Sequence, residues 1–178
     1  MDHTICLCVP GHIQFTQMVE DFTRSICLHF YPDASLHHDN LCMVMNEVFT
    51  NVVHHSDTKD LNELVRIQMC INPASIRVSI VDHGPGIRVK NQHPPYKPSL
   101  IGHREPFRKV LDGTVFLKVN SPEQLVFSFE SGSLVSDLHQ FNGRGFGLSI
   151  ITKIMDRLTY SALGNGRFNW EMVKKIQS

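Results

Sequence analysis

The sequence lacks the features that would place it in a membrane, on a nucleic acid or in a secreted scaffold. No uninterrupted apolar run reaches the roughly 18 residues that a membrane-spanning helix needs. The first residues carry no basic segment ahead of their apolar ones, as a signal peptide would. Seventeen Lys and Arg balance seventeen Asp and Glu, so bulk charge favours neither nucleic acid nor an anionic membrane. We therefore expect a soluble, cytosolic protein that recognises its partners locally.

Patterns for disulfides and for metal binding are also absent. The five cysteines are odd in number and irregularly spaced, so we expect buried thiols and no disulfide framework. Neither CxxC nor HExxH occurs. Adjacent histidines such as His37-His38 and His54-His55 point about 100° apart on a helix and cannot chelate one ion together. A structural zinc site stays open as an interpretation, but the spacing favours surface or capping histidines.

A chain of 178 residues fits one domain with its own core. Two amphipathic patterns predict helices: 15–30, with Phe15, Met18, Val19, Phe22, Ile26 and Phe30 on one side, and 36–55, with Leu41, Val44, Met45, Val48, Val52 and His55. Alternating patterns predict strands at 5–9, 63–72, 74–82, 113–119 and 124–130. A glycine-rich loop that opens a helix is predicted at 143–158, and two closing strands follow it. This order predicts an α+β fold: a two-layer sandwich of a mixed, mostly antiparallel sheet with helices on one face.

Three polar patterns interrupt these elements. Glu47 and Asn51 lie four residues apart on the second helix, Asp82 ends a strand in DHGPGI, and GRGFGL (143–148) opens the last helix. Taken singly, each has an ordinary structural explanation: a solvated helix edge, a strand end before a turn, and a glycine-rich turn. Taken together, they supply the groups that hold a magnesium nucleotide, although no GxxxxGK[ST] motif is present.

The chemistry of each pattern suits one part of such a nucleotide. The carboxylate of Asp82 can accept a hydrogen bond from a purine amine, and Gly84 and Gly86 leave room for the flat base. Backbone amides at the start of a helix, here behind a glycine loop, bind phosphate oxygens. Asn51 offers Mg²⁺ a neutral oxygen, and Glu47, one helical turn away, can act as a base.

The ordered set E-x-x-x-N with a following histidine, D-x-G-x-G-I and G-x-G-x-G-L resembles the GHKL ATPase superfamily. A short chain with this order is similar to the bacterial anti-sigma factor serine kinases, over nearly all of residues 5–176. The resemblance implies the Bergerat ATP-binding fold, with Glu47 as catalytic base and Asn51 on Mg²⁺. It further implies that ATP is bound by the other motif residues: His55, Asp82, Gly84, Gly86, Ile87, Gly143, Arg144, Gly145, Phe146, Gly147 and Leu148.

The expected function is therefore that of an ATP-dependent serine/threonine kinase, which phosphorylates a small anti-sigma antagonist protein and holds a sigma factor. A homodimer is left open. Two alternatives remain: a non-catalytic, nucleotide-responsive binding module, and a detached ATP domain of a histidine kinase.

The chain departs from the family pattern at three places. An enlarged lid insertion at about 88–141 separates the second and third motifs, and we expect residues 88–112 to be mobile until nucleotide orders them. In GNGRFN (164–169), Arg167 stands near the position where the family has a threonine. Gln17 replaces an arginine expected on the first helix.

Overall fold

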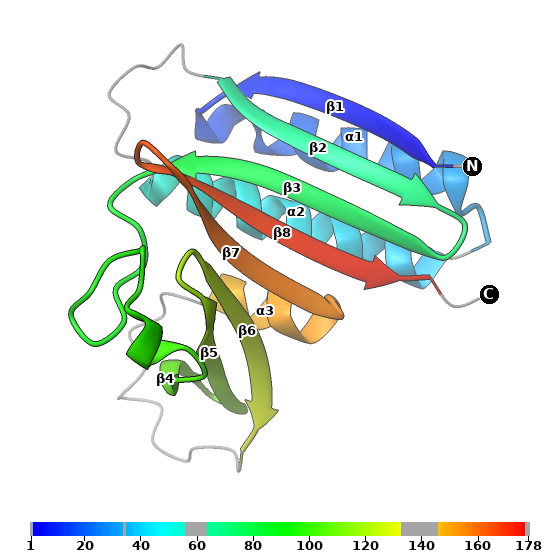
Figure 1. Ribbon diagram of the computed structural model, residues 1–178. Coiled ribbons are helices and arrows are strands. Elements are labelled where there is room, and N and C mark those ends of the chain that lie inside the picture. Colours follow the sequence, from blue (N-terminus) through cyan, green and yellow to red (C-terminus); the bar gives the residue numbers. More distant parts are fainter. Residues whose placement is uncertain (1, 34, 56–63, 133–145, 177–178) are drawn as a thin grey trace.

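The computed structural model describes residues 2–33, 35–55, 64–132 and 146–176 (Figure 1). Within these ranges, eight strands form one sheet in the order β1-β2-β3-β8-β7-β6-β5-β4. The strands are β1 (His3–Pro10), β2 (Leu64–Asn72), β3 (Ser75–His83), β4 (Arg104–Val110), β5 (Gly113–Ser121), β6 (Gln124–Ser131), β7 (Arg157–Gly164) and β8 (Arg167–Lys175). All seven pairs of neighbouring strands are antiparallel.

The described helices lie on one face of this sheet, so the structure has two layers (Figure 1). They are α1 (Thr16–Phe30), α2 (Ser35–His55) and α3 (Phe146–Ile154), with single 3₁₀ turns at η1 (Ile13–Phe15) and η2 (Pro98–Leu100). The predicted α+β two-layer fold is confirmed, with the refinement that the described sheet is antiparallel throughout and not mixed.

The central strands bury one side of their alternating pattern, as the sequence predicts. On β2 and β3 the buried side chains are Val65, Ile67, Met69, Ile71, Ile76, Val78 and Ile80. Every second residue of a strand faces the same side of the sheet, so these side chains all point toward the helices. The hydrophobic effect of this face holds the two layers together.

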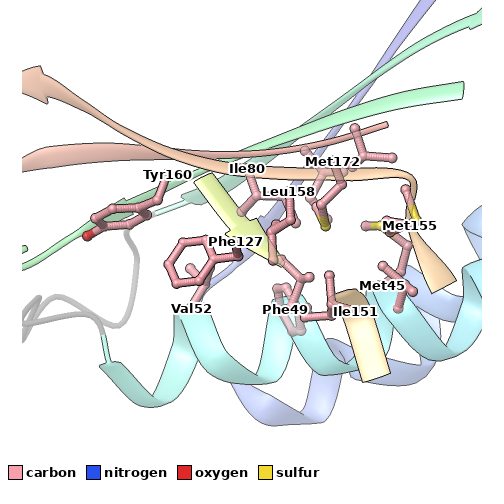
Figure 2. Packing of buried hydrophobic residues seen from close by; sticks show 14 of the residues in the cluster. Met45, Phe49, Val52, Ile80, Phe127, Ile151, Met155, Leu158, Tyr160 and Met172 are labelled. Atoms are coloured by element: carbon pink, nitrogen blue, oxygen red, sulfur yellow. The ribbon is translucent and has the colours of Figure 1, made fainter. Parts of the chain in front are cut away.

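Helix α2 supplies the other half of the core (Figure 2). Met45, Phe49 and Val52 project toward the sheet, where Ile80, Leu158 and Met172 meet them. The predicted apolar stripe of α2 is buried except for its last member. His55 is exposed, because it is the final residue of the helix and borders a cavity beyond the core.

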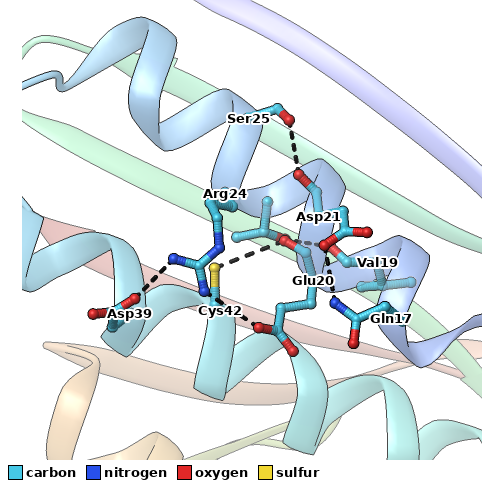
Figure 3. Close-up of polar contacts among 9 residues, drawn as sticks. Gln17, Val19, Glu20, Asp21, Arg24, Ser25, Asp39 and Cys42 are labelled. Carbon is cyan, nitrogen blue, oxygen red and sulfur yellow. Dashed lines mark hydrogen bonds and ion pairs between the residues drawn. The ribbon is translucent and has the colours of Figure 1, made fainter.

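Polar contacts join α1 to α2 along their outer sides (Figure 3). Arg24 donates from Nη1 to Asp39 Oδ1 at 2.9 Å and pairs through Nη2 with Glu20 Oε1 at 3.3 Å. Gln17, the expected partner-facing position, bonds Asp21 on its own helix at 2.9 Å. Met18, predicted on the apolar side of α1, is half exposed, because the buried side is centred on the neighbouring residue, Val19.

The segment that follows β3 is anchored and not simply a loose loop. Val89 and Tyr96 are buried, and the Tyr96 hydroxyl donates to the carbonyl oxygen of Ile87 at 2.8 Å. The predicted hairpin is confirmed as β5 and β6. Strand β4 was not predicted, and it adds an edge strand to the sheet through β5. The mobility of residues 88–112 without nucleotide stays a prediction. The last part of the predicted insertion, 133–141, lies outside the described residues.

The cysteines only partly match the prediction of buried thiols. Cys27 and Cys42 are buried, but Cys6 and Cys8 are exposed on β1 and Cys70 is half-buried on β2. The two exposed thiols alternate along β1 with the less exposed Ile5, Leu7 and Val9, so they lie on the side that faces away from the helices. None of the described helices is both long and apolar enough to cross a membrane.

Candidate functional site

A cavity of about 1070 Å³ opens beside the end of β3, where α2 ends and α3 begins. This size suits a ligand as large as a nucleotide. The cavity is lined by Asn51, His54, His55, Asp82, Gly84, Pro85, Gly86, Ile87, Phe107, Arg108, Leu148, Tyr160 and Trp170. The lining thus combines the end of α2, the DHGPGI turn, the start of α3 and residues from three further strands.

Asp82 is a half-buried acid that lines this cavity. Its Oδ2 accepts a hydrogen bond from Trp170 Nε1 at 2.9 Å. Its Oδ1 is buried and accepts no hydrogen bond from any residue that the structure describes. A buried acceptor without a donor costs roughly 1 to 3 kcal/mol, so a ligand that offers an N–H group there would gain from satisfying it.

Burial dominates the electrostatics of Asp82. It raises the pKa of this carboxyl group above its ordinary value of 3.8, while the hydrogen bond from Trp170 and the nearby His83 and His55 lower it. Burial wins because removing a carboxylate from water disfavours its charged form. A donor group on a ligand would stabilise the same charged form, so ligand binding and ionisation of Asp82 are coupled.

An aromatic wall stands beside Asp82 on β7 and β8. Tyr160 lies opposite Trp170 in the sheet, with ring centroids 4.5 Å apart, and stacks on Phe168 at 5.1 Å. Phe168 is the cross-strand neighbour of Asp82 itself. The face of a flat heterocycle is compatible with such a wall, since aromatic rings provide large apolar contact area.

The last two strands bring to Asp82 a residue that the sequence analysis did not single out. Arg167, predicted near the position of a threonine at the adenine site, is exposed and lies across from His83. The hydrogen bond to Asp82 comes instead from Trp170, three residues later. Sequence reasoning missed Trp170, because only the register of β8 against β3 brings it to the acid.

The two glycines after Asp82 keep the floor of the cavity free of side chains. Gly86 has a φ of +77°, and a Cβ atom there would lie 2.6 Å from Cζ of Phe168. Gly84 donates its backbone N–H to the carbonyl oxygen of Gly166 at 3.1 Å, which ties the turn to the loop between β7 and β8. Both positions therefore support the prediction that this turn leaves space beside the acid.

Glu47 and Asn51 meet the start of α3. A Cβ atom built on Gly147 would overlap Oε2 of Glu47 and would lie 3.3 Å from Nδ2 of Asn51. The absent side chain of Gly147 thus lets α2 and α3 approach closely at these two polar groups. Asn51 lines the cavity, whereas the half-buried Glu47 is set back from it by one helical turn.

The structure brings most of the predicted site residues to one place. Those that line the cavity are Asn51, His55, Asp82, Gly84, Gly86, Ile87 and Leu148. Glu47 and Gly147 lie at the adjoining contact of α2 with α3, and Phe146 is the first residue of α3. Gly143, Arg144 and Gly145 lie outside the described residues.

Two kinds of lining residue were not predicted as site residues. His54 and Pro85 adjoin predicted motif residues, so inspection of the motif neighbours could have suggested them. Phe107, Arg108, Tyr160 and Trp170 come from strands that reach the cavity only through the pairing of the sheet. Across the described ranges, no three His, Cys, Asp or Glu residues form a group that could hold a metal ion.

Comparison with known families gives a match over most of the chain. A family model described as "Histidine kinase-like ATPase domain" matches residues 17–168. This range includes all three polar patterns and the whole segment from β2 to β7. No curated protein shows a significant match.

Proposed function

The chain belongs to the family of histidine kinase-like ATPase domains, and from this premise we propose that it is an ATP-dependent protein kinase of the serine/threonine type. The cavity beside Asp82 would hold ATP, and the terminal phosphoryl group would pass to a hydroxyl group of another protein. The reaction forms a bond between that hydroxyl oxygen and the γ-phosphorus, and ADP leaves.

The observation that carries this proposal is the unsatisfied Oδ1 of Asp82. It is a buried carboxylate oxygen at the wall of a nucleotide-sized cavity, next to two glycines and three aromatic rings. The exocyclic amine of adenine is a donor that would fill this position, whereas a base with a carbonyl oxygen in its place, such as hypoxanthine, would offer no donor there. Thr159 and Asn169 also have unpartnered buried oxygens, but neither lines the cavity.

The α2–α3 contact supplies the groups for phosphate transfer. The side-chain oxygen of Asn51 is a suitable ligand for Mg²⁺, which prefers oxygen ligands and retains several waters. When bound, Mg²⁺ would neutralise charge on the phosphate oxygens. The carboxylate of Glu47 would accept the proton of the attacking hydroxyl group, and Gly147 lets that carboxylate reach the start of α3.

The partners follow from the resemblance to anti-sigma factor kinases. On this proposal the phosphate acceptor is a small antagonist protein. The kinase would hold or release a sigma factor according to whether the antagonist is phosphorylated. Support for this finer assignment is the order of a strand and a helix ahead of the Glu47 helix.

The test separates binding from transfer. Glu47→Ala should abolish phosphate transfer from labelled ATP to a cytosolic protein while nucleotide affinity stays nearly intact, since a base acts on the attacking group and not on bound ATP. Asp39→Ala is the matched control, because Asp39 is an acid on the same helix that pairs with Arg24 and does not line the cavity.

A non-catalytic switch module is the second candidate. The observation that favours it is the large β4–β6 segment, which enlarges the surface around the cavity. A wild-type protein that binds ATP but transfers no phosphate to any cytosolic protein, with Glu47→Ala indistinguishable from it, would establish this second function and end the kinase proposal.

A further inference from the structure

Strand β4 reaches the cavity through a bulge. Pro106 pairs with Phe116 of β5, and the next paired residue of β4 is Arg108, which pairs with Val115. Phe107, between them, has no partner on β5 and is the extra residue of the bulge. In a regular strand, successive side chains point to opposite faces, yet Phe107 and Arg108 both line the cavity. Bulges re-aim side chains and are frequent beside active sites.

Phe107 connects this bulge to the aromatic wall. Its ring meets Phe127 edge-on, with centroids 5.6 Å apart, and Phe127 lies 5.6 Å from Trp170. Trp170 in turn donates its hydrogen bond to Asp82. The bulged strand therefore packs, through Phe107, against the aromatic residues beside Asp82. The exposed Arg108 is the next residue of the strand and lines the cavity.

Arg108 brings a permanent positive charge. It is the one Lys or Arg among the described residues that line the cavity, and it forms no ion pair with any residue in the described ranges. Nearby cations differ: Arg104 pairs with Glu130, and Lys153 pairs with Asp112. A guanidinium stays charged at any physiological pH and binds phosphate oxygens in a bidentate way.

The positive charge is separate from the negative one in the same cavity. Asp82 ends β3 and Arg108 belongs to β4, and strands β8, β7, β6 and β5 stand between these two in the order of the sheet. A ligand that binds both residues needs a hydrogen-bond donor for Asp82 at one point and a negative charge for Arg108 at another. An adenine nucleotide has this arrangement.

Charge composition of the surrounding segment agrees with an anionic ligand. Residues 88–110 hold six of the seventeen Lys and Arg but one of the seventeen Asp and Glu, although the chain as a whole is neutral. Such a local excess attracts anions and raises their rate of association.

We propose that Arg108, presented by the bulge of β4, binds the phosphate chain of the nucleotide. This inference rests on the proposed ATP binding and adds a phosphate contact from the inserted strand to the three motifs. It assigns to β4 a role in selecting nucleotides over nucleosides.

The experiment compares a ligand that has phosphates with one that lacks them. The affinities of ATP with Mg²⁺ and of adenosine are measured for wild type, Arg108→Ala, Arg108→Lys and Lys109→Ala by competition with a fluorescent adenine nucleotide. Lys109 is the matched control, because it is an exposed cation on the same strand and does not line the cavity.

Arg108→Ala should weaken ATP binding by about tenfold and leave adenosine within about twofold, as the loss of a charge-assisted hydrogen bond predicts. The ATP affinity of Arg108→Lys should lie between those of wild type and Arg108→Ala, and the ATP affinity of Lys109→Ala should equal that of wild type. An Arg108→Ala protein that keeps its ATP affinity, or loses ATP and adenosine equally, would overturn the inference while leaving the proposed function intact. A wild-type protein without ATP affinity would instead overturn the proposed function itself.

Discussion

The carboxyl group of Asp82 is placed at a cost to folding. Its pKa lies above the ordinary 3.8 because of burial, so between these two values the folded protein binds more protons than the unfolded chain. The contribution of Asp82 to stability therefore decreases as pH rises through this interval and is unfavourable at neutral pH. Such local costs are typical of groups that are kept for a ligand.

Replacing Asp82 by its neutral isostere should therefore raise stability while it weakens ATP binding. We expect a higher Tm for Asp82→Asn than for wild type at pH 7, since a buried amide costs less than a buried charge; each 1 kcal/mol would appear as about 2–4 °C. The difference should shrink as the pH falls toward 3.8 and Asp82 becomes protonated in both states. Differential scanning calorimetry over a range of pH measures both effects.

Asp112→Asn is the control, because its Tm at pH 7 should change in the opposite direction to that of Asp82→Asn. Lys153 lowers the pKa of this exposed carboxyl, so its stabilising contribution is present above pH 3.8 and is lost as pH falls through the lowered value. Its removal should slightly lower Tm at pH 7. A lower Tm for Asp82→Asn at pH 7 would contradict the account of Asp82 as a strained, ligand-directed acid.

Gly147 controls the position of Glu47. In Gly147→Ala, the new methyl group would meet the carboxylate of Glu47, which is the end of a flexible side chain and can move aside at little cost. We expect nearly unchanged thermal stability but at least about a hundredfold slower phosphate transfer, the scale of a displaced general base. Full transfer activity in a folded Gly147→Ala protein would show that the contact between Gly147 and Glu47 has no catalytic importance.

At the scale of elements, the turn after β3 depends on Gly86 for two separate reasons. Its φ of +77° disfavours a side chain, and the ring of Phe168 occupies the space where a Cβ would lie. Gly102 has a similar φ of +86° but nothing within 4 Å of a Cβ. A comparison of alanine substitutions at Gly86 and Gly102 therefore distinguishes the cost of backbone strain from the cost of overpacking.

Urea unfolding of the two alanine variants tests this distinction. Gly102→Ala should cost about 1 kcal/mol from backbone strain alone. Gly86→Ala should cost a further 1–3 kcal/mol, roughly the range for overpacking a filled site. Equal losses for the two variants would mean that Phe168 does not fill the space beside Gly86.

The elements that the sequence predicts are those with a strong periodic pattern. Helices α1 and α2 and the β2–β3 and β5–β6 hairpins have apolar residues at regular spacing, and their bounds agree with the prediction within a few residues. Strand β4 was missed because REPFRKV contains a proline and a bulge, and most of its side chains are exposed. Without a buried alternating side, a strand leaves little signal in its own residues.

The residues of the candidate site also fall into a group that the sequence predicts and a group that it does not. Asp82, Asn51 and Glu47 were predicted, because each belongs to a local motif of residue types. Trp170 and Arg108 were not, because their positions at the cavity depend on sheet register and on an irregularity of strand pairing. Local sequence therefore predicts the groups on single elements, and the structure adds those contributed by distant strands.

At the scale of the whole molecule, strands β4, β5 and β6 continue the main sheet. Strand β6 pairs with β7, and the buried Val115, Leu117 and Leu125 belong to the same apolar cluster as the core residues of α2. We infer that the predicted insertion belongs to the same single domain and does not form a second. The cavity lies between α2, α3 and the end of β3 on one side and β4 on the other.

The measurement that tests the central claim most directly is isothermal titration of ATP with Mg²⁺ into wild type and Asp82→Asn, with Asp112→Asn as control. We predict one ATP bound per chain for wild type and Asp112→Asn, and at least about tenfold weaker binding for Asp82→Asn, because the adenine amine loses its carboxylate acceptor. Absence of ATP binding by wild type, or an Asp82→Asn affinity within about twofold of wild type, would contradict the assignment of this cavity as the nucleotide site.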